Sequence, residues 1–350
     1  MNFLFFLLIS QTYNPDIAQI IQKVQVDSVY KNILRLQNFW TRHYRSDSMY
    51  KSRLWIKGRF QNYGYNLREH IFFYGNREQA NIIAKKEGFI DTLKPIIICA
   101  HYDSRGQNWS YPPYGPAPGA DDNASGVSLL IEIARVINNI DFDYTIKFIA
   151  FAAEEPGLIG STQLANYYRQ NNKKIKYLLN ADMIGGDINF VNNTVIIEYD
   201  MGNQVDTNNS KSFAFAETLK TIYNLYLPSL NTTYGNIFAS DYMPFEAYGY
   251  TTLGVFEKNF NSGYHTPRDV VDSLDINYAT NIIKGVLAFI LHTAKFHPVS
   301  VREKEVAIKN STFREGIYDI AGRKLDFKNF KSGIYILKKN ETTRKILRLK

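Results

Sequence analysis

Residues 144–155 read Tyr-Thr-Ile-Lys-Phe-Ile-Ala-Phe-Ala-Ala-Glu-Glu, an apolar run of strand length that ends in two adjacent carboxylates. Residues 94–101 repeat this pattern as Lys-Pro-Ile-Ile-Ile-Cys-Ala-His, and this run ends in a histidine. In open α/β sheets, ligands bind at the carboxyl ends of the strands. We therefore expect an α/β fold, in which a mixed, mostly parallel sheet lies between helices and carries a functional site at the C-terminal edge of its strands.

Residues of metal-ligand type recur at such positions along the chain. Residues 177–182 form a third apolar run that ends in an aspartate, and residues 118–126 form a loop with two adjacent aspartates before an amphipathic helix. Paired carboxylates at the end of a buried strand are costly without a cation, because they repel each other and lose hydration. In chain order the series is His101, Asp122, Glu154, Glu155, Asp182 and His265. These residue types suffice for two zinc ions that share an aspartate, with one carboxylate left as a general base.

Most members of the series also fit a structural role when each is taken singly. His101 fits a packed histidine, Asp122 fits a helix cap, and residues 264–269 fit an ordinary turn. Asp103 lies two residues after His101, on the same face of an extended chain. It is therefore placed to accept the second ring N–H of His101, as partners of metal-bound histidines do.

Five short segments contain the residues of this series, and a sixth lies between Asp182 and His265. The six are His101-Tyr-Asp-Ser104, Gly119-Ala-Asp-Asp-Asn-Ala-Ser-Gly126, Ala153-Glu-Glu-Pro-Gly-Leu-Ile-Gly-Ser161, Asn180-Ala-Asp-Met-Ile-Gly185, Ser240-Asp-Tyr-Met-Pro-Phe245 and Tyr264-His-Thr-Pro-Arg-Asp269. In this order they resemble the motifs of metallopeptidase family 28, and the similarity covers most of residues 25–297. This family contains leucyl-type aminopeptidases and glutamate carboxypeptidases, with the glutaminyl cyclases as relatives.

The resemblance implies a zinc-dependent exopeptidase with two zinc ions. One zinc would be held by His101, Asp122 and Asp182. The other would be held by Asp122, Glu155 and His265, so that Asp122 bridges the two ions.

The resemblance also implies the reaction, removal of the N-terminal residue from a peptide substrate. Glu154 would be the general base that activates a metal-bridging water, and Tyr264 resembles the tyrosine that stabilises the oxyanion. In the family, the peptide bond between the residues that match Asp122 and Asn123 is often cis.

Three alternatives stay open at this point. A glutaminyl cyclase-like aminoacyltransferase would keep one zinc and use the paired glutamates for intramolecular amide transfer, and a carboxypeptidase would act at the other terminus. A catalytically dead binding module would keep the fold without turnover, although it has no need to retain Glu154.

Two departures from the family pattern, Ala181 and Tyr242, touch no expected ligand. Tyr242 stands where a histidine is common, and we expect it to reshape the substrate pocket.

The composition fits an exported enzyme. The chain has 350 residues, of which 45% are apolar and 15% aromatic, so disorder is excluded. No apolar stretch is long enough to span a membrane, and the apolar run at residues 3–9 predicts a signal peptide over residues 1–12. We expect a peptidase domain over residues 13–299. The single cysteine, Cys99, cannot form an intrachain disulfide.

The last part of the chain, residues 300–350, has a character of its own. Residues 301–350 contain 14 Lys and Arg against 6 Asp and Glu, which accounts for the formal net charge of +8 of the whole chain. Because the catalytic part is then neutral, nucleic-acid binding is disfavoured. Alternating apolar residues and glycine turns predict a small β module. It resembles the C-terminal sorting domain of cargo of the Bacteroidetes type IX secretion system. This resemblance predicts a secreted or cell-surface protein that engages the secretion machinery through its tail, whereas the sequence leaves the oligomeric state open.

Overall fold

A computed structural model of the protein describes residues 11–106 and 115–297, together with four short strands of the C-terminal part. The predicted signal peptide at residues 1–12 lies almost wholly outside the described residues. The chain divides into two units, residues 1–296 and 297–350. The predicted domain limits at residues 12 and 299 stay predictions.

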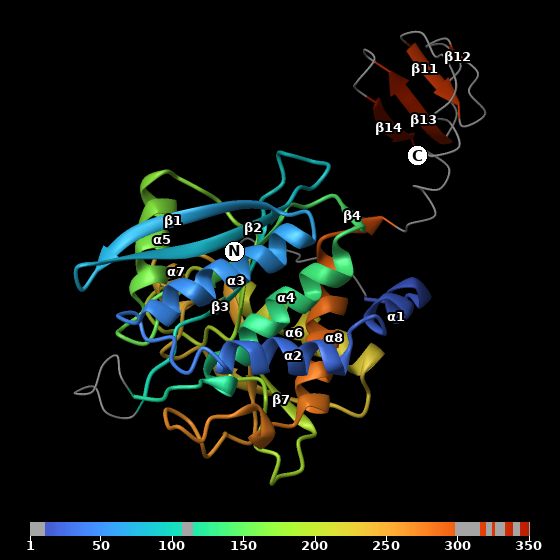
Figure 1. The fold of residues 1–350 in the computed structure, drawn as a ribbon. Helices are drawn as coiled ribbons and strands as arrows, with labels where there is room; N and C mark the ends of the chain where they lie inside the picture. The colour runs from blue at the N-terminus through green and yellow to red at the C-terminus, as the bar shows by residue number, and fades with distance from the viewer. Residues whose placement is uncertain are drawn as a thin grey trace. The chain divides into compact units, whose positions relative to one another are not determined.

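The first unit is built on an eight-stranded sheet of order β1-β2-β5-β3-β6-β9-β7-β8 (Figure 1). Its four central strands are parallel, whereas β1, β2 and β7 each pair antiparallel with a neighbour. The predicted α/β fold with a mixed, mostly parallel sheet is therefore confirmed. The strands are β1 (Asn66–Tyr74), β2 (Arg77–Lys86), β3 (Ile96–His101), β5 (Ile146–Phe151), β6 (Leu178–Ala181), β7 (Thr194–Tyr199), β8 (Asn231–Asn236) and β9 (Thr252–Glu257).

Helices cover both faces of this sheet, and strand β3 shows how the sequence achieves this. Ile96, Ile98 and Ala100 join the larger apolar core, whereas Ile97 and Cys99 join a second core on the other face, together with α5 and α7. A strand that is apolar throughout is stable only when both of its faces are buried. The helices are α1 (Pro15–Ile21), α2 (Val26–Gln37), α3 (Asp47–Asn62), α4 (Gly126–Ile137), α5 (Ile159–Gln170), α6 (Asn209–Tyr226), α7 (Met243–Glu246) and α8 (Ile276–Thr293).

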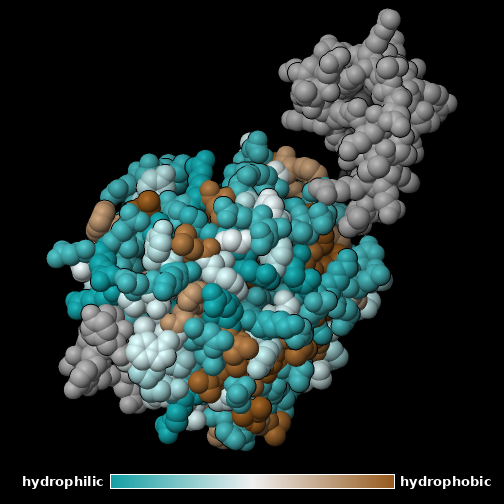
Figure 2. Space-filling view, in the orientation of Figure 1, coloured by the Kyte–Doolittle hydropathy of each residue, from teal (hydrophilic) through white to brown (hydrophobic). Residues whose placement is uncertain are grey.

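Short elements complete the first unit. A π-helical turn η1 (Ala120–Ser125) leads into α4, the 3-10 turn η2 (Val271–Ser273) precedes α8, and β4 (Asp141–Phe142) pairs with β10 (Phe296–His297). The surface in Figure 2 is mostly hydrophilic, with apolar residues gathered over part of it. Among the residues described, no helix combines the length and the apolar character that a membrane crossing requires.

The second unit contains a four-stranded antiparallel sheet of order β12-β11-β13-β14. Its strands are β11 (Gly316–Asp319), β12 (Lys324–Leu325), β13 (Gly333–Lys338) and β14 (Arg344–Leu349). The strands coincide with the alternating apolar segments from which the sequence predicts a small β module.

Candidate active site

The expected ligands come together at one edge of the sheet. His101 is the last residue of β3, Glu154 and Glu155 follow β5, and Asp182 follows β6 directly. Asp122 lies in η1, and His265 lies in the loop after β9. Because β5, β3, β6 and β9 are adjacent and parallel, their carboxyl ends converge and so do these side chains.

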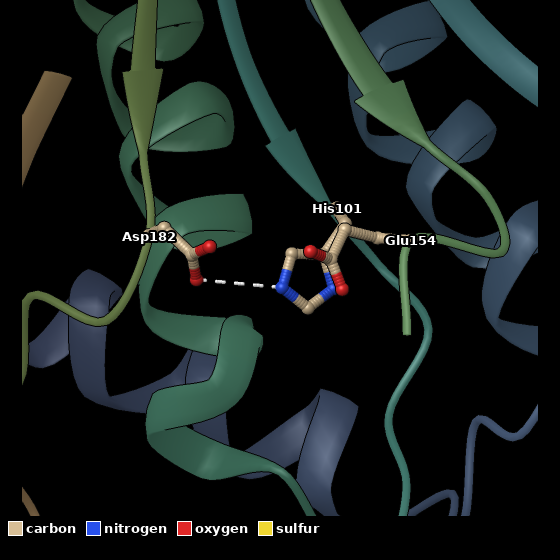
Figure 3. Close-up of side chains that lie close together, drawn as sticks. All are labelled: His101, Glu154 and Asp182. Carbon is tan, nitrogen blue, oxygen red and sulfur yellow. Dashed lines mark ion pairs between the residues drawn. The ribbon is translucent and has the colours of Figure 1, made fainter. Parts of the chain in front are cut away.

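Asp122 lies between the two histidines and faces each of them with a different oxygen. Its Oδ1 lies 3.1 Å from Nε2 of His101, and its Oδ2 lies 2.8 Å from Nε2 of His265. The second contact of His101 Nε2 is Asp182 Oδ1 at 3.4 Å, shown in Figure 3. The second contact of His265 Nε2 is Glu155 Oε2 at 3.0 Å. The side chains therefore form two groups of three that share Asp122.

The residues present fit zinc in both groups. Zinc bonds of about 2.0–2.2 Å at tetrahedral angles place neighbouring ligand atoms about 3.3–3.6 Å apart, close to the separations of 2.8–3.4 Å in these groups. Glu155 Oε1 and Asp182 Oδ1 are buried and, within the described part of the chain, accept no hydrogen bond. Ligand-type atoms of His101, Glu154 and Asp182, and of His101, Asp122 and Glu155, also cluster within 4.8 Å. The contacts of the His101 and His265 imidazoles include all five expected ligands, and they define the two groups of three.

The electrostatics of the site also call for cations. Burial raises the pKa of Glu155 to about 7, with Asp122 adding to the rise and His265 opposing it. Burial likewise raises the pKa of Glu154 well above its usual range, opposed by His101 and reinforced by Glu155. His101 shows the converse, because burial lowers its pKa but the carboxylates of Glu154 and Asp182 raise it overall. Dense negative charge in a buried site is stabilised when metal ions bind.

Asp103 lies beside His101, as expected, and also contacts the segment that follows β5. Its Oδ1 lies 3.5 Å from Nδ1 of His101, which is too long for a good hydrogen bond. Its two carboxylate oxygens instead accept the backbone N–H groups of Glu154 and Glu155, at 3.0 and 3.1 Å. Asp103 therefore fixes the backbone that carries the expected general base and one expected ligand.

Tyr264 lies at the rim of the site. Its ring stacks on the imidazole of His265, with centroids 3.6 Å apart, and the side chain is about one-third exposed (36%). It lines a cavity of about 280 Å³ together with the ligand groups. This placement fits the expected oxyanion role, which stays a prediction.

Several residues that support the ligands were not predicted from the sequence. Arg42 is fully buried, and its guanidinium donates to the carbonyl oxygens of Tyr102, Pro118 and Gly119. It thereby ties the segment after β3 to the loop before η1. Gly119 has a positive φ of 53°, and a Cβ there would lie 2.3 Å from the carbonyl oxygen of Asp122. No other residue fits at this position.

Asp269 and Ser240 hold two of the ligands directly. Asp269 accepts the backbone N–H groups of Asp121 and Asp122, at 2.8 and 3.1 Å. The hydroxyl of Ser240 donates to Oδ2 of Asp182 at 2.5 Å. Both residues lie in motifs that the sequence singles out, but their roles depend on contacts with distant segments. The peptide bond between Asp122 and Asn123 is cis, as the family resemblance implies.

Comparison with known families identifies the chain. Residues 81–290 match Peptidase family M28. The chain belongs to this family. The match contains all six residues of the expected series, from His101 to His265, and also Tyr264. The family predicted from the motifs is therefore confirmed.

Curated relatives of this M28 chain include enzymes from fungi. A probable leucine aminopeptidase 1 of Trichophyton verrucosum is 28% identical over 294 residues, which cover 79% of the chain and 76% of the relative. A probable zinc metalloprotease of Pyrenophora teres f. teres is 30% identical over 196 residues, which cover 50% of the chain and 42% of that protein.

Solved structures share the fold of the M28 chain. The Legionella pneumophila LapA aminopeptidase superposes with a TM-score of 0.69 at 22% identity, covering 81% of the chain and 75% of that structure. A Bacteroides thetaiotaomicron glutaminyl cyclase superposes with a TM-score of 0.61 at 19% identity, covering 76% of the chain and 97% of that structure. At these identities the likeness concerns the fold alone, so it does not separate peptidases from cyclases.

Proposed function

We propose that the protein removes N-terminal residues from peptides with the help of two zinc ions. Family membership and the leucine aminopeptidase relatives confirm the predicted enzyme class, a metalloaminopeptidase. The observation that carries the two-zinc proposal is the position of Asp122, which faces His101 with one oxygen and His265 with the other. Asp122, Glu155, Asp182 and Glu154 together carry four negative charges when ionised, which balance the charge of two zinc ions.

Zinc, when bound, lowers the pKa of water and polarises the scissile carbonyl. Glu154 is positioned to act on such a water, because its carboxyl lies within 4.8 Å of the ligand atoms of His101 and Asp182. Asp103 fixes the backbone from which this side chain extends. We infer that Glu154 accepts the proton of the attacking water and returns it to the leaving amine.

The small volume of the cavity supports exopeptidase action. Its volume of about 280 Å³ lies at or below the lower end of the usual range for ligand sites, about 300–1,000 Å³. Such a cavity accepts one residue of a peptide. Tyr264, at the rim, is positioned to donate its hydroxyl to the oxyanion that forms next to it.

The glutaminyl cyclase alternative is less well supported than the peptidase. A cyclase that keeps one zinc has no need for a second complete group of ligands, yet both groups are complete here. Incubation with a peptide that begins with glutamine distinguishes the two, because a peptidase releases free glutamine and a cyclase leaves pyroglutamate on the peptide.

The test of the proposed function combines metal content with activity. Elemental analysis of the purified chain should give two zinc ions per molecule, and leucyl-4-nitroanilide should be hydrolysed. Chelation should abolish hydrolysis, and added zinc should restore it. A fully zinc-loaded protein that cleaves no aminoacyl substrate would show that the site has lost its catalytic role.

We further propose that the protein is exported and that residues 300–350 act as its sorting signal. Support comes from the apolar start of the chain and from the basic tail with its alternating apolar segments. The antiparallel order of β12-β11-β13-β14 agrees with a separate small β module. Comparing the cell-surface and medium fractions of the full chain with those of a chain that lacks the tail tests this proposal.

A further inference from the structure

The cavity beside the expected zinc ligands contains one acidic residue that the reaction does not use. Glu198 lies on β7, opposite Gly254 on β9, and lines the cavity together with Tyr242. Its side chain is mostly buried, with the residue 9% exposed. Neither predicted zinc group includes Glu198, so its carboxyl has another role.

The fold makes room for this carboxyl. A Cβ at position 254 would lie 2.6 Å from Oε2 of Glu198 and 2.9 Å from the ring of Tyr242. Glycine at this position therefore lets both side chains pack across β9. Tyr242 is the residue that stands in place of the common histidine, so this departure from the family pattern belongs to the same arrangement.

Tyr242 fixes the orientation of Glu198. Its hydroxyl lies 3.0 Å from Oε2 of Glu198 and 3.1 Å from the carbonyl oxygen of Phe238, and it accepts the N–H of Phe238 at 2.9 Å. The tyrosine is itself buried, at 1% exposure. Only Oε2 of Glu198 is engaged by a hydrogen bond among the described residues, so Oε1 is available to an occupant of the cavity.

The carboxyl of Glu198 has no cationic partner in the described part of the chain. Burial raises its pKa to about 8, against the hydrogen bond of Tyr242, and the charged residue that acts on it is Asp182, a second acid. The charges of the expected zinc ions are already balanced by their carboxylate ligands together with Glu154. A cationic group that enters with the substrate would therefore favour the ionised form of this carboxyl.

A substrate has two possible cations, the terminal α-amine and a basic side chain. The α-amine lies next to the scissile bond and hence near Asp182 and the other expected ligands. Strand β9 separates β7 from β6, so Glu198 lies two strand spacings, about 10 Å, from the strand that Asp182 follows. This distance matches the reach of a long side chain. Met183, Phe256 and Phe260 give the same cavity an apolar part of its lining.

We propose that Glu198 selects substrates with lysine or arginine at the N-terminus. The apolar part of the lining packs against the aliphatic stem, and the carboxylate of Glu198 pairs with the terminal ammonium or guanidinium group. This inference rests on the proposed aminopeptidase function and specifies its substrate class.

The test compares four aminoacyl-4-nitroanilides, those of lysine, arginine, leucine and methionine. The wild-type chain should show a higher kcat/KM for the two basic substrates. Glu198→Gln, which keeps the size of the side chain, should lower kcat/KM for the basic substrates about 10- to 100-fold and change it less than about threefold for leucine and methionine. Glu198→Asp, which keeps the charge, should retain part of the preference, and the exposed Glu87→Gln should change neither class.

Binding of the products gives a second readout that does not depend on turnover. Calorimetric titration of the zinc-loaded chain with free L-lysine should show tighter binding than with L-leucine, and Glu198→Gln should remove the difference. A wild-type preference for leucine in both experiments would overturn the inference and leave the aminopeptidase proposal standing. An equal loss of kcat/KM for all four substrates in Glu198→Gln would overturn it too. That result would mean that Glu198 binds the α-amine or supports the fold. Selective binding of lysine without any hydrolysis would refute the aminopeptidase proposal instead.

Discussion

Asp269→Asn is the substitution that best tests whether the zinc ligands are held by their backbone. Asp269 is 1% exposed, and its carboxylate accepts three hydrogen bonds. Oδ1 accepts the backbone N–H of Asp121 and the side-chain amide of Asn261, and Oδ2 accepts the backbone N–H of Asp122. An amide offers one oxygen only. In the less costly orientation, the asparagine oxygen keeps the two hydrogen bonds at Oδ1. Its NH₂ group then faces the N–H of Asp122.

The expected cost follows from this geometry. One buried N–H loses its acceptor, which costs about 1–3 kcal/mol of unfolding free energy. For a domain of this size that corresponds to a fall in Tm of about 2–10 °C. Because the lost bond is the one to Asp122, zinc affinity should also fall, and the difference in Tm between variant and wild type should be larger with zinc than in EDTA.

Thermal unfolding followed by circular dichroism, with and without zinc, measures the first effect, and competition with a zinc chelator measures the second. Asp272→Asn, at an exposed position in the same region, is the matched control and should match the wild type in both. A Tm within 1 °C of the wild type, or a fall in Tm with unchanged zinc affinity, would refute the argument that Asp269 positions Asp122.

Four further outcomes are expected. Glu154→Gln should keep both zinc ions yet lower kcat by roughly two to four orders of magnitude, and near-wild-type turnover in the metal-loaded variant would rule out the general-base role. Asp122→Ala should lose zinc, which elemental analysis checks, because both groups share this residue. Glu198→Gln should raise the free energy of unfolding by at most about 5 kcal/mol at pH 8.5 and by little at pH 4.5, which Tm measured against pH checks. The folded-state pKa of Glu198 is raised to about 8, above its unfolded value near 4.5. The cost of ionising the buried group therefore begins above pH 4.5 and reaches its full size above pH 8. A chain that ends at residue 299 should fold, bind zinc and cleave substrate but fail to reach the cell surface, and aggregation or inactivity would show that the tail belongs to the catalytic unit.

The positions of the expected ligands could be predicted because each lies where a local pattern ends. His101 closes an apolar run, and Asp182 follows one directly, so strand periodicity and the rule for strand ends place both at the same edge of the sheet. The fold class follows from the same runs. These predictions need only short-range information, since the parallel arrangement of the central strands brings the ends together.

The supporting residues could not be predicted, because their partners are distant in sequence. Arg42 binds carbonyl oxygens 60 and 76 residues away, and Asp269 binds N–H groups almost 150 residues away. The contacts of Asp103 with the backbone N–H groups of Glu154 and Glu155 could not be predicted for the same reason. Its spacing to His101 correctly places the two on one face, but the N–H groups at Glu154 and Glu155 are the better donors.

Chemistry and substrate selection occupy different parts of the sheet. The expected zinc ligands and the general base follow or border the parallel strands β5, β3, β6 and β9, whereas Glu198 lies on β7, which pairs antiparallel with β9. We therefore expect substitution on β7 to change the far end of the cavity more than the ends of the parallel strands. The replacement of a common histidine by Tyr242 fits this division, because its hydroxyl binds Glu198 and Phe238 and no expected ligand. A catalytic edge of this kind can retain its metals while the neighbouring antiparallel strand changes which N-terminal side chain fits.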